Sequence, residues 1–205
     1  MTDEINATDV KKELILDVAR KLIVQYGYGK TTLDDIANAI GMKKSSLYYY
    51  YKNKEDIMYE VMMREKSVYL KVIKEALEIV GSTHDKIINY ERTKANYLKK
   101  SISPFDITIN QFIEIKRSIK DIFKNMECDE KQLIAEVISN GIKKNEIKKC
   151  SKEKVAEAII TISEAIRFRE FYNTETLRMR ELDFDIVLKQ TEEIINLIFN
   201  GIRKQ

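Results

Sequence analysis

Proline, tryptophan and cysteine are scarce or missing in this chain of 205 residues. One proline and six glycines leave few points at which a helix is forced to end. The two cysteines, Cys128 and Cys150, stand too far apart to indicate a disulfide framework or a metal site. We therefore expect an all-α chain of few, long elements, with no metal and no cofactor.

Long apolar runs are also missing. Charged residues interrupt every apolar stretch, which excludes a helix that spans a membrane. The first residues, MTDEINATDVKKEL, contain no apolar core of the kind that a signal peptide requires. We expect a cytoplasmic protein without a membrane partner.

Catalytic motifs are absent as well. The single histidine, His84, lies at a predicted helix junction, and no glycine-rich phosphate loop is present. No serine or cysteine is presented beside a recognisable base. These absences predict that the protein is not an enzyme.

Helical periodicity is what the sequence does contain, and 44% of its residues are hydrophobic, enough for a sizeable core. An apolar stripe from Ile15 to Tyr26 predicts a helix that starts after Asp9, its N-cap, and ends at Gly27. Thr32 and Asn53 are predicted N-caps of two later helices. The further predicted helices cover residues 33–40, 44–51, 54–80, 84–100, 113–126, 131–144, 155–172 and 184–202.

The second and third of these helices are short and joined by a tight turn, which is typical of a helix-turn-helix. Gly41 stands in the turn, where a left-handed backbone is needed. The positions expected to face inward all hold apolar side chains: Ile36, Ala37, Ile40, Met42 and Leu47.

Four consecutive tyrosines, Tyr48 to Tyr51, follow in the stretch GMKKSSLYYYYKNKED. Successive helical residues turn by about 100°, so Leu47 and Tyr51 share the buried face. The outward face and its flanks then carry Lys43, Lys44, Ser45, Tyr48, Tyr49, Tyr50, Lys52 and Lys54. Lysines and tyrosine hydroxyls can bind phosphates, and rings can contact thymine methyl groups, so double-stranded DNA is the predicted partner. A solvated lysine-rich turn beside tyrosines that cap the core is the alternative.

The stretch TTLDDIANAIGMKKSSLYYYYKNKEDIMYEVM, residues 31–62, resembles the DNA-binding region of TetR/AcrR-type transcriptional regulators. It lies where that family has it, after one N-terminal helix and before a long fourth helix. The family's frame of conserved residue types is matched at Thr32, Ile36, Ala37, Gly41, Leu47, Tyr48, Tyr50, Tyr51 and Lys54.

The resemblance implies about nine helices in two parts. Residues 1–55 would form a three-helix DNA-binding domain, and residues 56–205 a ligand-binding and dimerisation domain. It also implies a homodimer built from the last two helices, a palindromic operator, and repression that a small molecule relieves.

The resemblance further assigns roles within residues 32–54. Thr32 and Lys54 would contact phosphates, Lys44, Ser45 and Tyr48 would face bases, and Tyr49 and Tyr50 would contact the DNA backbone. Relatives often have serine or threonine at position 43 and glycine at position 45. Here Lys43 and Ser45 stand instead, and Lys43 cannot cap a helix with its side chain.

The last two predicted helices carry apolar stripes wider than a single seam requires, which favours a four-helix dimer interface. The alternative is that both stripes belong to the core of one chain. The predicted interface residues are Ile159, Ile162, Ile166, Val187, Thr191, Ile194, Ile195 and Ile198.

A ligand site is predicted from aromatic side chains and a polar neighbour in the middle helices, with ordinary core as the alternative role of each aromatic. The candidates are Tyr90, Glu91, Tyr97, Phe105, Phe112, Phe123, Phe168 and Tyr172. Arg167 and Arg169 interrupt an otherwise apolar helix, which indicates buried pairing or an anionic group on the ligand; interface salt bridges with Glu164 or Glu170 are the alternative. We expect an apolar or amphipathic ligand.

The sequence thus predicts a dimeric, sequence-specific DNA-binding regulator of transcription, most simply a ligand-released repressor. An all-helical protein-interaction module without specific DNA binding is the alternative. The salt dependence of DNA binding separates the two, because phosphate contacts weaken steeply with salt.

Overall fold

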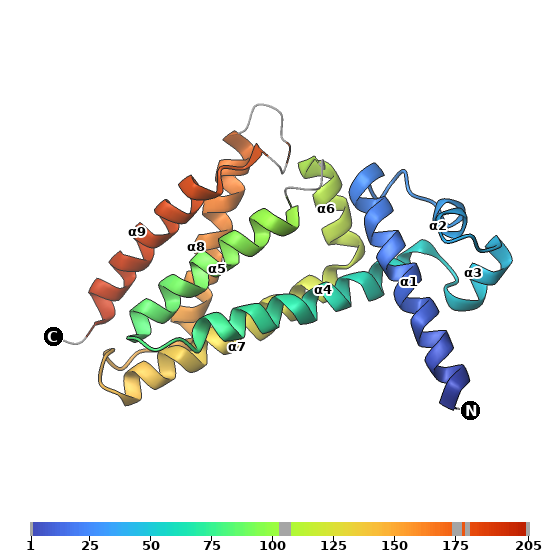
Figure 1. The fold of residues 1–205 in the computed structure, drawn as a ribbon. Helices are drawn as coiled ribbons and strands as arrows, with labels where there is room; N and C mark the ends of the chain where they lie inside the picture. The colour runs from blue at the N-terminus through green and yellow to red at the C-terminus, as the bar shows by residue number, and fades with distance from the viewer. Residues whose placement is uncertain (1, 103–107, 174–177, 179–180, 204–205) are drawn as a thin grey trace.

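The computed structural model describes residues 2–102, 108–173, 178 and 181–203 (Figure 1). Apart from isolated bridges that join Thr108 to Arg178 and Ile147 to Arg203, these residues form helices, turns and loops. The helices are α1 (Thr2–Tyr26), α2 (Leu33–Ala39), α3 (Lys44–Tyr50), α4 (Lys54–Leu77), α5 (Thr83–Ile102), α6 (Ile109–Ser118), α7 (Lys120–Lys143), α8 (Lys152–Asn173) and α9 (Phe184–Ile202). The predicted all-α fold of about nine helices is confirmed.

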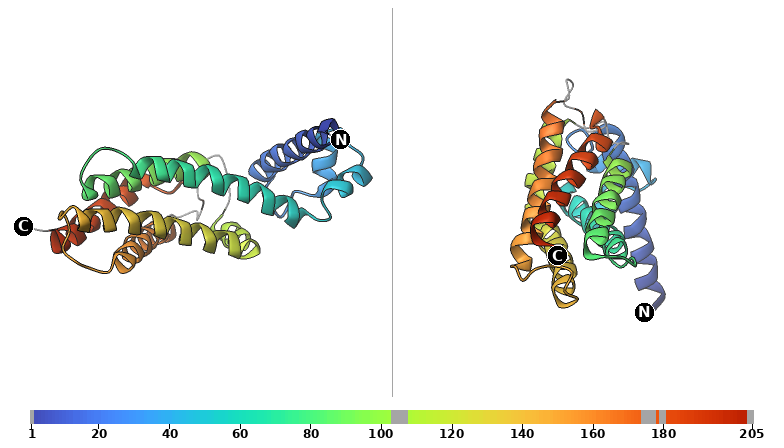
Figure 2. Two further views of the ribbon diagram at one scale, coloured as in Figure 1. Left: turned by 90° about the horizontal axis from the view of Figure 1, so that it is seen from below. Right: turned by 90° about the vertical axis from the view of Figure 1, so that its left-hand side faces the viewer.

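The helices form two groups joined by α4. Helices α1 to α3 lie at one end of the molecule and α5 to α9 at the other, while α4 runs from one group into the other (Figures 1 and 2). At its N-terminal end α4 packs against α1, and further along it packs against α5 and α7. Helix α8 lies between α7 and α9, and α5 packs against α9.

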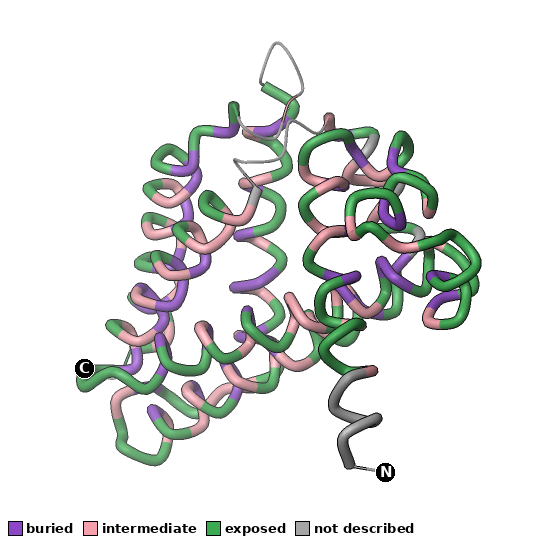
Figure 3. The backbone as a smooth tube through the Cα atoms, turned by 45° about the vertical axis from the view of Figure 1, so that its right-hand side comes forward, coloured by how far each residue is buried: buried purple, intermediate pink, exposed green. Residues whose placement is uncertain are grey.

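The N-terminal group has a small core of its own, which we call the head core. Each of its helices buries one face and exposes the other, as amphipathic helices do (Figure 3). The core includes Ile57 and Val61 of α4, so this helix completes the head. Its buried members are Ile15, Leu16, Ala19, Ile36, Ala37, Leu47, Tyr51, Ile57 and Val61.

The C-terminal group is built around a larger apolar cluster from α4, α5, α7, α8 and α9. Gly141 of α7 allows a close approach here, because a Cβ at this position would lie 2.2 Å from Oγ1 of Thr83. A second cluster, which includes Ile109, Ile166, Phe171 and Phe184, packs α6 against α8 and α9.

A third cluster, which we call the junction cluster, connects the two groups. Its buried members are Ile23 of α1, Met58 of α4, Ile119, and Ile122 of α7. Through this cluster α1 and α4 pack against the start of α7.

Two predicted helix boundaries are wrong. Asp9 lies inside α1, which begins at Thr2 rather than after Asp9. The predicted break at residues 127–130 is absent, because α7 continues through it and buries Glu130 among hydrogen-bond donors. The chain instead breaks at Ile119, where no proline or glycine signals an end.

Candidate functional site

The turn between α2 and α3 has the geometry of a helix-turn-helix. Gly41 has a φ of +66°, in the left-handed region that favours glycine. The backbone N–H of Met42 then donates to the carbonyl of Ala37 at 2.9 Å and closes the end of α2. The position of α3 is thereby fixed against α2.

Thr32 caps α2, as predicted. Its hydroxyl accepts a hydrogen bond from the N–H of Asp35 at 3.2 Å, and Asp35 accepts from the N–H of Thr32 at 2.8 Å. Both bonds of a capping box are therefore present. The hydrogen bonds from Thr32 hold the pKa of Asp35 below its usual range. Thr32 itself stays exposed.

Helix α3 begins at Lys44, and Lys43 occupies the N-cap position without a side-chain cap. The ammonium of Lys44 lies 2.8 Å from Oδ2 of Asp34, and both side chains are about half exposed. This hydrogen bond is the main cause that raises the pKa of Lys44. Water surrounds the pair, so a phosphate can compete with Asp34 for Lys44.

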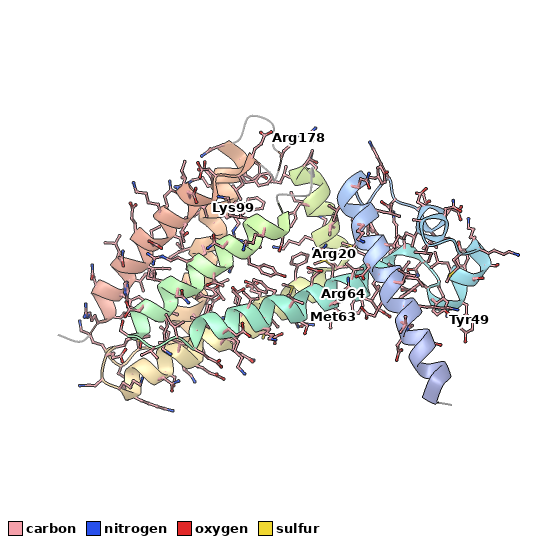
Figure 4. All side chains as sticks on the ribbon, in the orientation of Figure 1. Arg20, Tyr49, Met63, Arg64, Lys99 and Arg178 are labelled. Carbon is pink, nitrogen blue, oxygen red and sulfur yellow. The ribbon has the colours of Figure 1, made fainter. Side chains whose placement is uncertain are left out.

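The outward face of α3 is a polar and aromatic surface that the head core does not use. Lys43, Lys44 and Ser45 are exposed, and the side chains of Tyr48 and Tyr49 are 46% and 81% exposed. Figure 4 shows Tyr49 at the end of the molecule farthest from α5 to α9, directed away from the ribbon. We call Lys44, Ser45, Tyr48 and Tyr49 the α3 face.

The remaining tyrosines of the run pack inward. Tyr51 is 3% exposed and its hydroxyl donates to Glu60 at 2.6 Å, so its predicted place in the core is confirmed. Tyr50 lies against the head core and meets the ring of Tyr49 edge to face. The four rings therefore divide between the core and the surface as the helical geometry predicts.

Lys54 joins the start of α4 to the turn after α1. Its ammonium donates to the carbonyls of Tyr28 and Thr31 at 2.7 and 2.9 Å and lies 4.2 Å from the centre of the Tyr28 ring. Burial, with the nearby Glu55, raises the pKa of Tyr28 to about 12. A lysine has three donors, so one remains for the predicted phosphate contact.

The residues chosen for the dimer interface lie mostly inside one chain. Five of them are 5% exposed or less, because α8 and α9 use these positions to pack on α5 and α7. These five are Ile159, Ile166, Val187, Thr191 and Ile195. The other three, Ile162, Ile194 and Ile198, are partly buried against the same clusters. The choice of residues therefore requires correction, since any interface on these helices must use their exposed side.

A cavity of about 530 Å³ lies within the C-terminal group, between α4, α5, α6, α7 and α8. Its size falls in the range of small-molecule sites, about 300–1,000 Å³. Most of its wall is apolar or aromatic and comes from Met62, Tyr69, Tyr97, Leu98, Ile109, Phe112, Phe123, Met126, Phe168, Phe171 and Leu182.

The predicted ligand residues fall into three groups. Those that line the cavity are Tyr97, Phe112, Phe123 and Phe168. Tyr90 and Glu91 are buried behind the wall, and Tyr172 is exposed and packs on Phe168. Phe105 lies outside the described residues.

A buried polar network at the cavity wall was not predicted. Lys94 donates to Glu130 at 2.7 Å, and Glu130 also accepts from the hydroxyls of Tyr69 and Tyr90. Burial raises the pKa of Glu130, but the charge of Lys94 and these hydrogen bonds outweigh it and hold the pKa below its usual range. Lys94 follows Ile87 and Tyr90 at helical spacing on the apolar face of α5. A lysine on an apolar face is the feature of the sequence from which a buried ion pair could have been predicted.

The two arginines of α8 have different surroundings. Arg167 lines the cavity, while Arg169 is exposed and donates to the side chain of Gln190 on α9. Neither forms a salt bridge with Glu164 or Glu170 among the described residues. Salt bridges across an interface with a second copy stay a prediction.

Metal-ligating side chains do not gather anywhere in the described part of the chain. Cys128 and Cys150 both carry free thiols. None of the helices within the described ranges is long and apolar enough to cross a membrane.

Comparisons with known proteins agree with the geometry of the head. Residues 15–61 match the family described as bacterial regulatory proteins, tetR family. YhgD, an HTH-type transcriptional regulator of Bacillus subtilis, is 26% identical over 77% of this chain and 83% of its own length. IcaR of Staphylococcus epidermidis, a negative regulator of the biofilm operon icaADBC, is 52% identical over 22% of this chain and 25% of its own.

A solved structure extends the similarity over the whole fold. A transcriptional regulator from Cytophaga hutchinsonii superposes with a TM-score of 0.78 over 95% of this chain and 99% of its own, at 24% identity. The relatives are regulators of transcription rather than enzymes. The sequence match covers the helix-turn-helix, and the fold match covers the helices behind it. Residues 15–61 therefore carry the DNA-binding region of the tetR family of bacterial regulatory proteins, and the whole chain has the fold of a solved transcriptional regulator.

Proposed function

We propose that this protein is a homodimeric repressor whose α3 face binds a palindromic operator and which a small ligand releases. The observation that carries the proposal is the α3 face itself. Lys44, Ser45, Tyr48 and Tyr49 stand exposed on a helix that the turn at Gly41 fixes in position. A helix presented in this way fits the major groove of DNA.

Repression is the mode that the similarity to IcaR supports. That protein is a negative regulator, and its 46 matched residues are 52% identical to this chain. A repressor requires no contact with RNA polymerase, since occupation of the operator blocks transcription. The charge of the head also suits the role, because residues 42–54 contain four lysines and no acid.

A dimer is proposed on the exposed sides of α8 and α9. A helix-turn-helix protein reads two half-sites about 34 Å apart, which one copy cannot do. Phe168 and Tyr172 of α8 and Ile186 and Leu197 of α9 are 42–69% exposed in the single chain. Large apolar side chains exposed on both helices favour association with a second copy.

The ligand is proposed to bind in the cavity and to act through α4. Met62 and Glu65 of α4 line the cavity, and Glu65 also forms an ion pair at 2.9 Å with Arg20 of α1. Met58, one turn earlier, belongs to the junction cluster. A ligand that displaces α4 therefore changes the spacing of the two α3 faces in a dimer, which weakens operator binding.

Selection from random duplexes, followed by fluorescence anisotropy, tests the proposal. The selected duplex is titrated at about physiological salt with scrambled DNA as competitor. The proposal predicts saturation at two chains per duplex and a palindromic consensus. A protein-interaction module would instead yield no consensus sequence and equal affinity for selected and scrambled DNA.

A further inference from the structure

The charged side chains that face the cavity are unevenly paired, and this bears on the ligand of the proposed function. At the inner wall, Lys94 and Glu130 are 5% and 7% exposed and lie 2.7 Å apart. Their charges cancel, and Tyr69 and Tyr90 donate to the same carboxylate. This pair is satisfied within the protein and leaves no net charge for a ligand to match.

Arg167 differs from that pair. It lines both the cavity and a small hollow between α5, α8 and α9, yet its guanidinium forms no hydrogen bond or ion pair with any described residue. Its electrostatic influence reaches Glu91, whose carboxylate accepts from Ser163 at 2.5 Å. Burial raises the pKa of Glu91 despite the opposing charges of Lys94 and Arg167, and no ion pair joins this carboxylate to Arg167.

The other described acids that line the cavity are engaged or exposed. Glu65 pairs with Arg20, and Glu127 and Glu164 are exposed to water. Solvent screens exposed charges far more than partly buried ones. Lys116, Lys120 and Lys124 lie exposed along the same wall and add positive charge.

From these observations we infer that the cavity binds an amphipathic anion, a carboxylate at one end of a long apolar body, and that Arg167 holds the carboxylate. The planar guanidinium presents parallel N–H donors that match the two oxygens of a carboxylate. The aromatic wall formed by Phe112, Phe123 and Phe168 accommodates the apolar body. The inference rests on the cavity being the ligand site of the proposed repressor.

Three probes with one tail and different head groups test the inference. Dodecanoate, 1-dodecanol and dodecyltrimethylammonium are titrated below their micelle concentrations by isothermal titration calorimetry. Dodecanoate is expected to bind about 10- to 100-fold more tightly than the alcohol, as hydrogen bonds to a charged group contribute. The cationic probe is expected to bind most weakly.

Variants locate the effect. Arg167→Met is expected to abolish the preference for dodecanoate while dodecanol still binds, which also shows that the cavity is folded. Arg167→Lys keeps the positive charge but loses the parallel N–H donors of the guanidinium. It is expected to retain part of the preference for dodecanoate. Arg169→Met is the matched control, because Arg169 lies two residues along α8 and does not line the cavity. It is expected to behave as the wild type.

Several results would overturn the inference. Equal affinity for all three probes would show that the cavity does not select an anionic head group. Arg167 would not be the residue that holds the carboxylate if the preference for dodecanoate survives in Arg167→Met. The same conclusion follows if the preference disappears only when Lys116, Lys120 and Lys124 become glutamine. If no probe binds, the ligand class is wrong. Operator binding measured on the same preparation shows separately whether the proposed repressor function also fails.

Discussion

The head and the C-terminal group use buried and exposed polar residues in opposite ways. In the head, α1 to α3 close around a small apolar core, and the side chains proposed to bind DNA stand outside it on α3. In the C-terminal group, the helices surround a cavity of about 530 Å³ and hold charged side chains inside, at Lys94 and Glu130. In the proposed function, the first group presents exposed side chains to DNA and the second encloses a small ligand.

This difference determines how the two groups respond to change. Exposed side chains of α3 contribute little to folding, so they are free to serve recognition. The buried ion pair Lys94–Glu130 affects stability, because loss of one partner leaves the other charge buried and unpaired. Substitutions on the exposed face of α3 should therefore change DNA binding without changing stability. Substitutions of the buried pair at the cavity wall should change stability and ligand binding together.

Glu130→Gln is expected to have the largest effect. The variant leaves Lys94 buried without a counterion and should lose about 3–5 kcal/mol in the free energy of unfolding. Urea denaturation followed by circular dichroism measures this. Glu127→Gln, one turn earlier and exposed, is the control and should change stability by no more than about 0.5 kcal/mol. Equal stability of Glu130→Gln and the wild type would contradict the buried pair.

The same variant predicts a pH dependence. The pKa of Glu130 is held below its usual range, so its stabilisation is full above the pKa of an unfolded glutamate, about 4.3. It is lost as the pH falls through the lowered value. The difference in stability between the wild type and Glu130→Gln should therefore shrink in acid. A difference that grows below pH 4 would contradict the direction of the shift.

Tyr51→Ala should have the next largest effect and marks the inner side of the tyrosine run. Removal of a ring that is 3% exposed should cost the head about 3–5 kcal/mol. Tyr49→Ala, two residues earlier and 81% exposed, should leave the melting temperature unchanged and weaken operator binding. If both variants melt alike, the division of the tyrosines between core and surface is wrong.

Leu197→Glu sharpens the comparison at the opposite end of the molecule. Leu197 is 69% exposed on α9, so a charge there should leave the folded chain intact and disrupt the proposed dimer. Sedimentation should show a monomer, and operator affinity should fall by about 100-fold as the second half-site is lost. A dimer that persists would place the interface elsewhere.

Asp34→Asn should have the smallest effect on folding. The Lys44–Asp34 pair is exposed, so its removal should not change the melting temperature. Operator affinity should rise a few-fold, because Lys44 is released and a negative charge near the DNA is removed. Weaker DNA binding in this variant would mean that Asp34 positions Lys44 for contact.

The sequence predicted the head in detail because its structure is local. The cap at Thr32, the turn at Gly41 and the inward face of Leu47 and Tyr51 follow from spacing within about twenty residues. The cavity required contacts between distant segments, such as that between Lys94 and Glu130. A lysine and a glutamate at separate positions look like surface residues until the fold brings them together, and a hydrophobic stripe does not show which neighbour covers it. For this reason Ile159 and Ile195 were assigned to a dimer although they pack within one chain.

The most direct test of the central claim compares the wild type with the double variant Lys44→Ala/Tyr48→Ala by fluorescence anisotropy on the selected operator and on scrambled DNA. The wild type should prefer the operator by at least about 1,000-fold. The double variant should keep its melting temperature and lose at least about tenfold of that preference. An undiminished preference in the folded variant would contradict the claim that the α3 face reads DNA.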